Sequence, residues 1–402
     1  MAKSVEAIIN HHLLTWARES AGYTIEALAK KAKVKSEDLE DFERGTQRPT
    51  ITQLRRLADA CKRHIACFYL PDAPKGDFQP LKDFRRQHGA MEFHDTIKLG
   101  FEIRDAENRR ETALELMRDI GEKPAAFAAT ANLNENAESV GQRIRKLLGI
   151  DWQSQIGWAD PNEALNRWRA AVERSGVLVF QMSTVRASEV RALSIARNPL
   201  PIVLLNTKDH EHPRIFSLMH ECAHLMLRKG GICDIREDAP RGPDEQAVEV
   251  FCNAVAGAAL VPGAEFQESR REFLSTRPNA TIDDVARTYS YRLKVSPEVI
   301  LRRSLTFGFI TDAVYRTKRD QYQKESAERA ARKKEKRGGF VSPPRKVISN
   351  LGLPYTRVVL NGYGLEKITS SDLSDFLGIK LRHLPKVHSE LTAKSVKYWT
   401  QR

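Results

Sequence analysis

The segment Ser217–Leu225 carries two histidines four residues apart, with a glutamate directly after the first, inside an apolar run. Residues i and i+4 lie one above the other on one face of an α-helix, so His220 and His224 can bind one Zn²⁺ together. Glu221 projects about 100° further round the helix. A carboxylate there can take a proton from a water that the metal activates. The spacing therefore predicts a catalytic metal site on a helix.

The alternative is a surface helix whose two histidines and glutamate bind nothing. The rest of the run argues against it, because an apolar helix would place both imidazoles at the edge of a buried face. The apolar residues concerned are Phe216, Leu218, Met219, Leu225, Met226 and Leu227.

A catalytic zinc site needs three protein ligands, and Glu249 is the best candidate for the third. Apolar residues recur around it at spacings of three and four, which predicts a second helix. They are Val248, Phe251, Val255 and Ala259. The linker between the two helices is long enough for the chain to reverse and bring Glu249 to the histidines.

These two segments resemble the ImmA/IrrE metallo-endopeptidases, through Arg214–His224 and Glu249–Pro262. The resemblance implies that His220, His224 and Glu249 hold Zn²⁺ and that Glu221 is the general base, with Glu245 as the fallback third ligand. It also implies a protein substrate that is cut once, typically a repressor or an antitoxin-like regulator.

Residues 10–70 predict a compact group of helices. Thr24 and Ser36 are expected to cap the second and third helices, Gly45 to end the third, and Pro49-Thr50 to start a fourth. A helix, a tight turn and a second helix form the helix-turn-helix layout. The stretch resembles the Cro/repressor-type domain of XRE regulators. The residues that carry this resemblance are Gly22-Tyr23-Thr24, Leu28-Ala29, Glu43-Arg44-Gly45 and Arg48-Pro49-Thr50.

The third of these helices, which would enter the major groove, is unusually acidic. Its carboxylates, Glu37, Asp38, Glu40 and Asp41, would face phosphates unfavourably. DNA binding and docking of a protein partner or a second copy therefore both remain open. If this domain binds double-stranded DNA, the expected phosphate contacts are Lys30, Lys31, Lys33, Lys35, Arg44 and Arg48.

The sequence between and after these motifs predicts an α+β fold that is mainly α. Strands are expected at 177–180, 193–195 and 202–205, before the histidine helix of a zincin-like domain. His210, His212 and Arg214 are expected in a loop, with stabilisation of an oxyanion as the alternative. Arg302 and Arg303 are expected to pack on the protease, with DNA contact as the alternative.

The predicted parts are 1–70, the helix-turn-helix; 71–95, a linker with an Asp-Phe-Arg element at 83–85; 96–264, the peptidase with its preceding helices; 265–315, a helix-turn-helix-like subdomain; 316–339, a basic charged helix without a core face; and 340–402, a small C-terminal domain.

Composition indicates the class of partner and the cellular compartment to expect. The net charge of +13 favours a nucleic-acid or acidic partner. The five cysteines include no Cys-x-x-Cys pair, which indicates reduced thiols and a cytoplasmic protein. No apolar run reaches the roughly 18–20 residues of a membrane span.

The sequence thus predicts a zinc endopeptidase fused to a helix-turn-helix, acting on a regulator or a neighbouring toxin in a stress, mobile-element or toxin-antitoxin context. The alternative is a DNA-binding regulator or antitoxin whose metal site is structural or sensory, and a homodimer is possible in either case.

Overall fold

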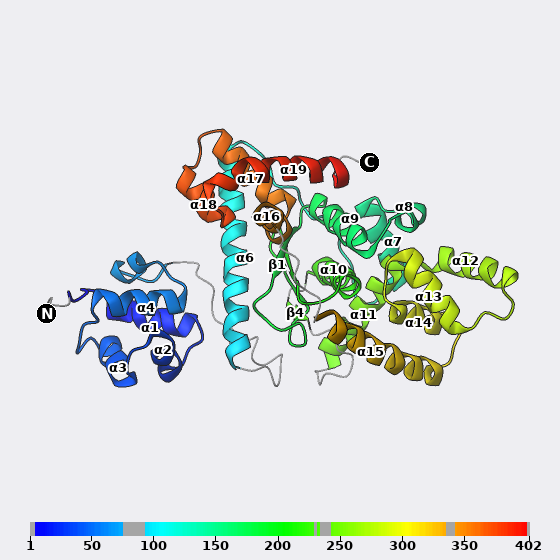
Figure 1. The fold of residues 1–402 in the computed structure, drawn as a ribbon, viewed down its shortest axis with the longest axis horizontal. Helices are drawn as coiled ribbons and strands as arrows, with labels where there is room; N and C mark the ends of the chain where they lie inside the picture. The colour runs from blue at the N-terminus through cyan, green and yellow to red at the C-terminus, as the bar shows by residue number, and fades with distance from the viewer. Residues whose placement is uncertain (1–4, 75–92, 229–230, 234–242, 335–341, 400–402) are drawn as a thin grey trace. The chain divides into compact units, whose positions relative to one another are not determined.

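The computed structural model describes residues 5–74, 93–228, 231–233, 243–334 and 342–399 (Figure 1). The Asp-Phe-Arg element and most of the expected linker lie outside these residues. The chain divides into two compact units, Met1–Asp105 and Ala106–Arg402. Both are rich in helices and the second holds one small sheet, which confirms the predicted mainly α, α+β class.

The first unit is all helical. Its elements are α1 (His11–Ser20), α2 (Ile25–Ala32), α3 (Ser36–Arg44), α4 (Ile51–Cys61), the 3₁₀ helix η1 (Ile65–Tyr69) and the first half of α6 (Phe93–Asp119). Thr24 caps α2 and Thr50 caps α4 through their side chains, and Gly45 ends α3 at a positive φ, as predicted. Ser36 was predicted to cap α3, and this is wrong: it is the first helical residue, and Lys35 precedes it without a side-chain cap.

An ion pair ties α1 to α3 in this unit. Arg18 donates from Nε and Nη2 to the two carboxylate oxygens of Glu43, at 2.8 and 3.0 Å, and from Nη1 to the carbonyl of Tyr23. Both side chains are largely buried. This two-pronged geometry fixes the guanidinium and holds the third helix against the first.

The sheet of the second unit has the strand order β1-β3-β2-β4. Its strands are β1 (Leu178–Met182), β2 (Ala192–Ile195), β3 (Ile202–Asn206) and β4 (Gly231–Cys233). β1 pairs parallel with β3, whereas β2 pairs antiparallel with both β3 and β4. The three predicted strands are confirmed. The three-residue β4, which follows the histidine helix, was not predicted because so short a segment carries no alternation.

Successive side chains of β1 and β3 pack on opposite faces of the sheet. Val179, Val203 and Leu205 face the helix α10 (Glu211–Met226), which packs on β2 and β3. Phe180 faces the opposite side, where its ring meets Tyr355 edge-on at 5.8 Å between centroids. The sheet is therefore covered on both faces, which explains why its strands read as continuous apolar runs.

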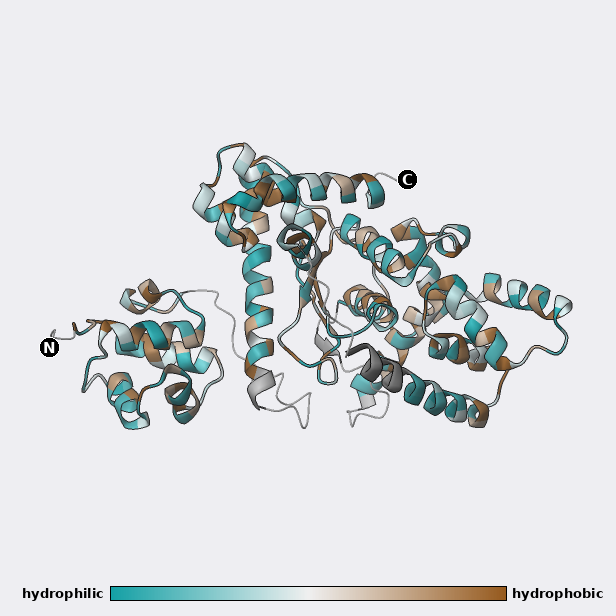
Figure 2. Ribbon diagram, viewed as in Figure 1, coloured by the Kyte–Doolittle hydropathy of each residue, from teal (hydrophilic) through white to brown (hydrophobic). Residues whose placement is uncertain are grey.

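Eight further helices surround α10 and the sheet, or extend from them. They are α7 (Ala137–Leu148), α8 (Trp152–Ile156), α9 (Pro161–Arg174), α11 (Pro243–Leu260), α12 (Gly263–Thr276), α13 (Ile282–Leu293), α14 (Pro297–Thr306) and α15 (Asp312–Lys334). Thr281 caps α13 and Ser296 caps α14 ahead of Pro297. Figure 2 shows α10 as a mostly hydrophobic helix and α15 as a mostly hydrophilic one.

The structure tests two predictions for this region, one for the charged helix and one for Arg303. The charged helix was predicted to lack a core face, and this is wrong, because Tyr322 is buried in the core together with Tyr315. Arg303 is buried and donates to the carbonyl of Val261, so it packs on the protease as expected. It also pairs with Glu138, and this rules out a DNA contact for that residue.

The last helices of the chain pack on the sheet and on α9. They are α16 (Pro343–Leu351), α17 (Leu353–Gly364), α18 (Ser370–Leu377), the 3₁₀ helix η2 (Leu381–His383) and α19 (Leu384–Tyr398). A buried ion pair within α9, Arg169–Glu173, binds their backbone: Arg169 donates to the carbonyl of Ser349, and Glu173 accepts from the amide of Leu353. Residues 342–399 therefore share the second unit, although 340–402 was predicted as an appended domain.

Among the described helices, none alone has the length and hydropathy of a membrane span, while the bent pair Asp244–Leu260 and Gly263–Thr276 meets both criteria jointly.

Candidate metal centre

Helix α10 supplies three of the four predicted site residues. His220 and Glu221 are fully buried and His224 is 4% exposed. The helix begins at Glu211, one residue after its N-cap His210. His212 and Arg214 were expected in a loop, and this is wrong, because both belong to the first turn of the helix.

Glu249 reaches the same point from the neighbouring helix α11. Its Oε2 lies 3.3 Å from Nε2 of His220, and its Oε1 lies 3.3 Å from Nε2 of His224. The two imidazole Nε2 atoms are 3.1 Å apart. The structure thus brings together three donors from two helices, and their ligand atoms all lie within 4.8 Å of one another. Glu245, the fallback ligand, lies one turn earlier on the same helix, is exposed, and is not part of the three-donor group.

This donor set fits a zinc ion. Two histidines and one glutamate, leaving a position open, form one of the ligand combinations of catalytic zinc. The three groups are buried and lie against one another. A cation between them would stabilise the buried carboxylate, because buried charges need a partner or a metal. Nδ1 of His220 lacks a hydrogen-bond partner among the described residues.

The protonation states follow from this packing. Burial lowers the pKa of His224, but its contacts with Cys252 and Glu249 outweigh that effect and raise the pKa to about 11. Burial raises the pKa of Glu249, yet its hydrogen bonds with His220 and His224 bring the pKa well below the usual range. A metal ion requires neutral imidazoles, so metal binding by these histidines would compete with their protonation.

Glu221 is buried close to the two histidines but is not one of the three donors. Neither of its carboxylate oxygens has a hydrogen-bond partner among the described residues. Burial raises the pKa of this carboxyl group, while the nearby His224 and His220 oppose the rise. A buried carboxylate with a raised pKa and free lone pairs is suited to accept a proton from a reacting water.

Two neighbours of the site were not predicted as site residues. Ser194, on β2, is buried close enough to Glu221 to lower the pKa of that carboxyl group. Cys252, one turn after Glu249, contacts His224. The i+3 spacing from Glu249 could have indicated Cys252, whereas the approach of a strand residue to a helix left no signal in the sequence. Burial raises the pKa of the Cys252 thiol, so it stays protonated.

The six basic residues considered for DNA contact lie in the last turn of α2, in the turn before α3, at the end of α3 and in the loop after it. All six, Lys30, Lys31, Lys33, Lys35, Arg44 and Arg48, are exposed. Arg44 pairs with Asp41 at 3.1 Å and with Glu40 at 3.5 Å. Asp41 also accepts from Thr46 and Gln47, so this carboxylate is engaged within its own loop. The acidity predicted for this face is therefore partly neutralised internally.

Comparison with known proteins agrees with both parts of this picture. Residues 172–305, which include the sheet, α10 and α11, match a peptidase family model described as the IrrE N-terminal-like domain. Residues 12–65 match a helix-turn-helix domain model. The chain therefore carries, in this order, a segment similar to a helix-turn-helix domain and a segment similar to an IrrE N-terminal-like domain. No curated protein matches it. The IrrE-like domain supports a metallopeptidase acting on protein, and the helix-turn-helix supports a DNA-binding part; both matches agree with the predicted resemblances.

Proposed function

We propose that the chain is a zinc-dependent endopeptidase that cuts a regulatory protein, with His220, His224 and Glu249 as metal ligands and Glu221 as the general base. The observation that carries the proposal is the convergence of three buried donors within 4.8 Å, beside a buried and unpartnered carboxylate. The match of residues 172–305 to the IrrE N-terminal-like domain supports the same reaction class.

Glu221 performs the proton transfers. When bound, a zinc ion supplies Lewis acidity toward the substrate carbonyl and the attacking water. Glu221 removes a proton from that water as its oxygen bonds to the carbonyl carbon. The same carboxyl group then delivers the proton to the amide nitrogen, and the C–N bond breaks. Its buried surroundings favour this role, because a raised pKa allows the group to accept and to return a proton.

The sheet offers a place for the substrate backbone. Among the strands that the structure describes, β4 is the last in the order, so one of its two sides is an edge of the sheet. An extended peptide can add to such an edge through main-chain hydrogen bonds. This mode of binding holds a single exposed segment, which fits one cut in a flexible region of a folded regulator.

The helix-turn-helix then delivers the peptidase to its target. In this proposal its exposed cations, including Lys30, Lys31 and Lys35, contact phosphates of double-stranded DNA near a DNA-bound repressor. The positive net charge of the chain favours this association. Partners in the same setting, which we place in the cytoplasm, are a repressor, an antitoxin-like regulator or a neighbouring toxin.

The test is intact-mass analysis of the neighbouring gene product, co-expressed with the wild type and with Glu221→Gln. The expected result is one new cleavage that appears only with the wild type. Glu245→Gln is the matched control, because it changes an exposed glutamate near the site, and it should cut as the wild type does. A partner that stays intact but co-purifies with every version would instead support a regulator whose metal site is structural.

A further inference from the structure

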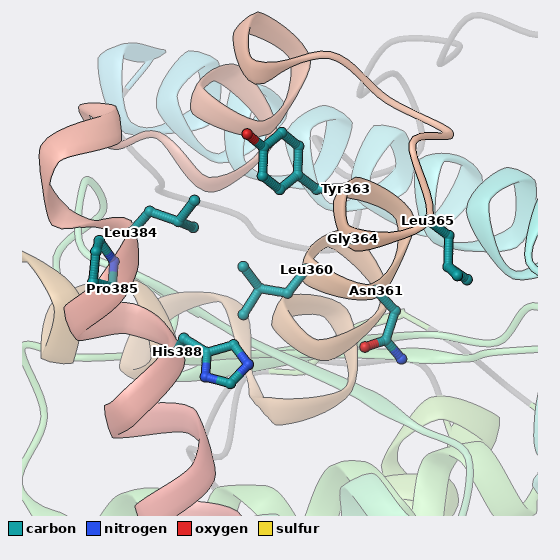
Figure 3. A pocket seen from close by; sticks show the side chains of 8 residues that line it. All are labelled: Leu360, Asn361, Tyr363, Gly364, Leu365, Leu384, Pro385 and His388. Carbon is teal, nitrogen blue, oxygen red and sulfur yellow. The ribbon is translucent and has the colours of Figure 1, made fainter.

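Ser194, on β2, carries a buried hydroxyl that the proposed cleavage mechanism does not use. The residue is 2% exposed, and its Oγ has no hydrogen-bond partner among the described residues. The mostly apolar hollow between α17 and α19, shown in Figure 3, offers a contrast, because no side chain that lines it holds a buried polar atom of this kind. A buried hydroxyl without a partner costs free energy, so its place beside the metal centre calls for a reason.

The pairing of β2 directs this side chain toward helix α10. Ser194 lies opposite Val203 of β3, and residues directly opposite each other in an antiparallel pair share one face of the sheet. Val203 packs in the core cluster that contains the apolar residues of α10. Ala192 belongs to the same cluster, and it shares a face with Ser194 because the two are separated by two residues along the strand. Both neighbours therefore place the Ser194 hydroxyl on the α10 side.

On that side the hydroxyl lies near the carboxylate of Glu221. Glu221 is fully buried, and neither of its oxygens has a hydrogen-bond partner among the described residues. Burial has the largest effect on the pKa of this carboxyl group and raises it, whereas His224, His220 and then the Ser194 hydroxyl act in the opposite direction. A hydroxyl donor and a carboxylate acceptor, both buried, thus lie close together, and a hydrogen bond between them would satisfy both.

Ser194 has a rigid backbone support for such a role. It pairs with Val203 of β3 on one side and with Gly231 of β4 on the other. Side chains on a paired strand are held more precisely than side chains on a loop, and a residue that positions a catalytic group needs this precision. Gly231 has no side chain, so it does not crowd the Ser194 side chain from the neighbouring strand.

We propose that Ser194 is a positioning residue for the general base, and that its hydroxyl donates a hydrogen bond to one carboxylate oxygen of Glu221. This bond occupies one oxygen and leaves the other for the proton of the attacking water. It also fixes the rotation of the carboxylate, and proton transfer is efficient only when the base is correctly placed. The inference rests on the proposed function for the role of Glu221, but the hydrogen bond itself does not depend on cleavage.

The kinetic test compares Ser194→Ala and Ser194→Thr in cleavage of the neighbouring gene product. Ser194→Ala should lower kcat about 10- to 100-fold, because a hydrogen bond to a charged group is lost. KM should change little, because the lost contact is to the base and not to the substrate. Ser194→Thr keeps the hydroxyl and should recover most of kcat. The matched control is Ser304→Ala on α14, which also removes a buried hydroxyl without a partner among the described residues, and it should cut as the wild type does.

Infrared spectroscopy detects the hydrogen bond without any cleavage. The difference spectrum between a protein and its Glu221→Gln version isolates the carboxyl band of Glu221. Loss of the hydrogen bond should shift this band in Ser194→Ala, while Ser194→Thr and Ser304→Ala should keep it at the wild-type position. Bound zinc, measured by inductively coupled plasma mass spectrometry, should equal the wild-type content in all three variants, because Ser194 is not a ligand.

The proposal is overturned if the Glu221 band of Ser194→Ala stays at its wild-type position, or if Ser194→Ala alone loses zinc. It is also overturned if Ser194→Ala cuts as fast as Ser304→Ala, or if Ser194→Thr is as slow as Ser194→Ala. A wild type that cuts nothing would instead contradict the proposed function, and the infrared band would still decide whether Ser194 binds Glu221. The two proposals can therefore fail separately.

Discussion

Replacing Gly352 with alanine should loosen the attachment of the C-terminal helices to the sheet. Gly352 has φ 78° and ψ 164°, in a region of backbone conformation that is almost restricted to glycine. A Cβ at this position would lie 2.6 Å from Oε1 of Glu173 and 3.1 Å from the carbonyl oxygen of Val179. The backbone carbonyl cannot give way easily, and the carboxylate belongs to the buried pair with Arg169.

The magnitude has two parts. Holding a residue with a side chain in this conformation costs about 1–3 kcal/mol. Displacing Glu173 from its partners adds a share of the roughly 3–5 kcal/mol that breaking a buried ion pair costs. We expect the free energy of unfolding of the second unit to fall by about 3–5 kcal/mol. For a unit of nearly 300 residues this corresponds to a decrease in Tm of roughly 5–8 °C.

Differential scanning calorimetry of the full chain measures this decrease, and Gly149→Ala separates its causes. Gly149 has φ 65° and no atom within 4 Å of an added Cβ, so alanine there meets backbone strain without a clash. We expect it to cost about 1 kcal/mol. Equal Tm values for the two variants would show that the close packing of Gly352 against Glu173 does not hold the C-terminal helices on the sheet.

Three other substitutions test further contacts. Glu249→Gln should lower the amount of bound zinc, measured by inductively coupled plasma mass spectrometry after dialysis. The control Glu245→Gln, at an exposed position, should keep the wild-type zinc content. Equal zinc in the two variants would contradict the assignment of Glu249 as a ligand. Arg18→Met should destabilise the first unit by about 3 kcal/mol, because it leaves Glu43 buried without its partner, and faster amide hydrogen exchange in this unit would show it. Arg303→Met should cost about 2–4 kcal/mol in the second unit by removing a hydrogen bond to the end of α11 and a carboxylate partner, and an unchanged calorimetric transition would argue against that link.

Most of the candidate site could be predicted from the local spacing of its residues. The positions of His220, Glu221 and His224 depend only on the helical period, which a sequence displays directly. Glu249 required one further step, the phase of a second helix. Ser194 could not be predicted in the same way, because its approach to Glu221 depends on how β2 packs against α10, and no repeat in the sequence encodes that packing.

Helix ends were predictable where a side chain forms the cap. Thr24 and Thr50 each accept a hydrogen bond from the first turn, and helices α2 and α4 begin where these residues predict. The short elements η1, α8 and β4 were not predicted, since three to five residues contain too little periodicity. In α15, the charge pattern concealed the buried Tyr322, because a few inward residues in a long helix barely alter its average polarity.

The sequence of the C-terminal helices alone did not indicate that they pack on the sheet. Their segment follows a basic stretch and has its own capped helix at Ser370–Leu377, so it reads as an appended domain. The sheet explains why it packs on the peptidase instead. Strands that carry apolar residues on both faces, as β1 does with Val179 and Phe180, need cover on both faces. Helix α10 covers one face, and Tyr355 of α17 meets Phe180 on the other. An apolar β1 therefore already implied a second covering layer, although it could not indicate that the layer comes from more than 150 residues later in the chain.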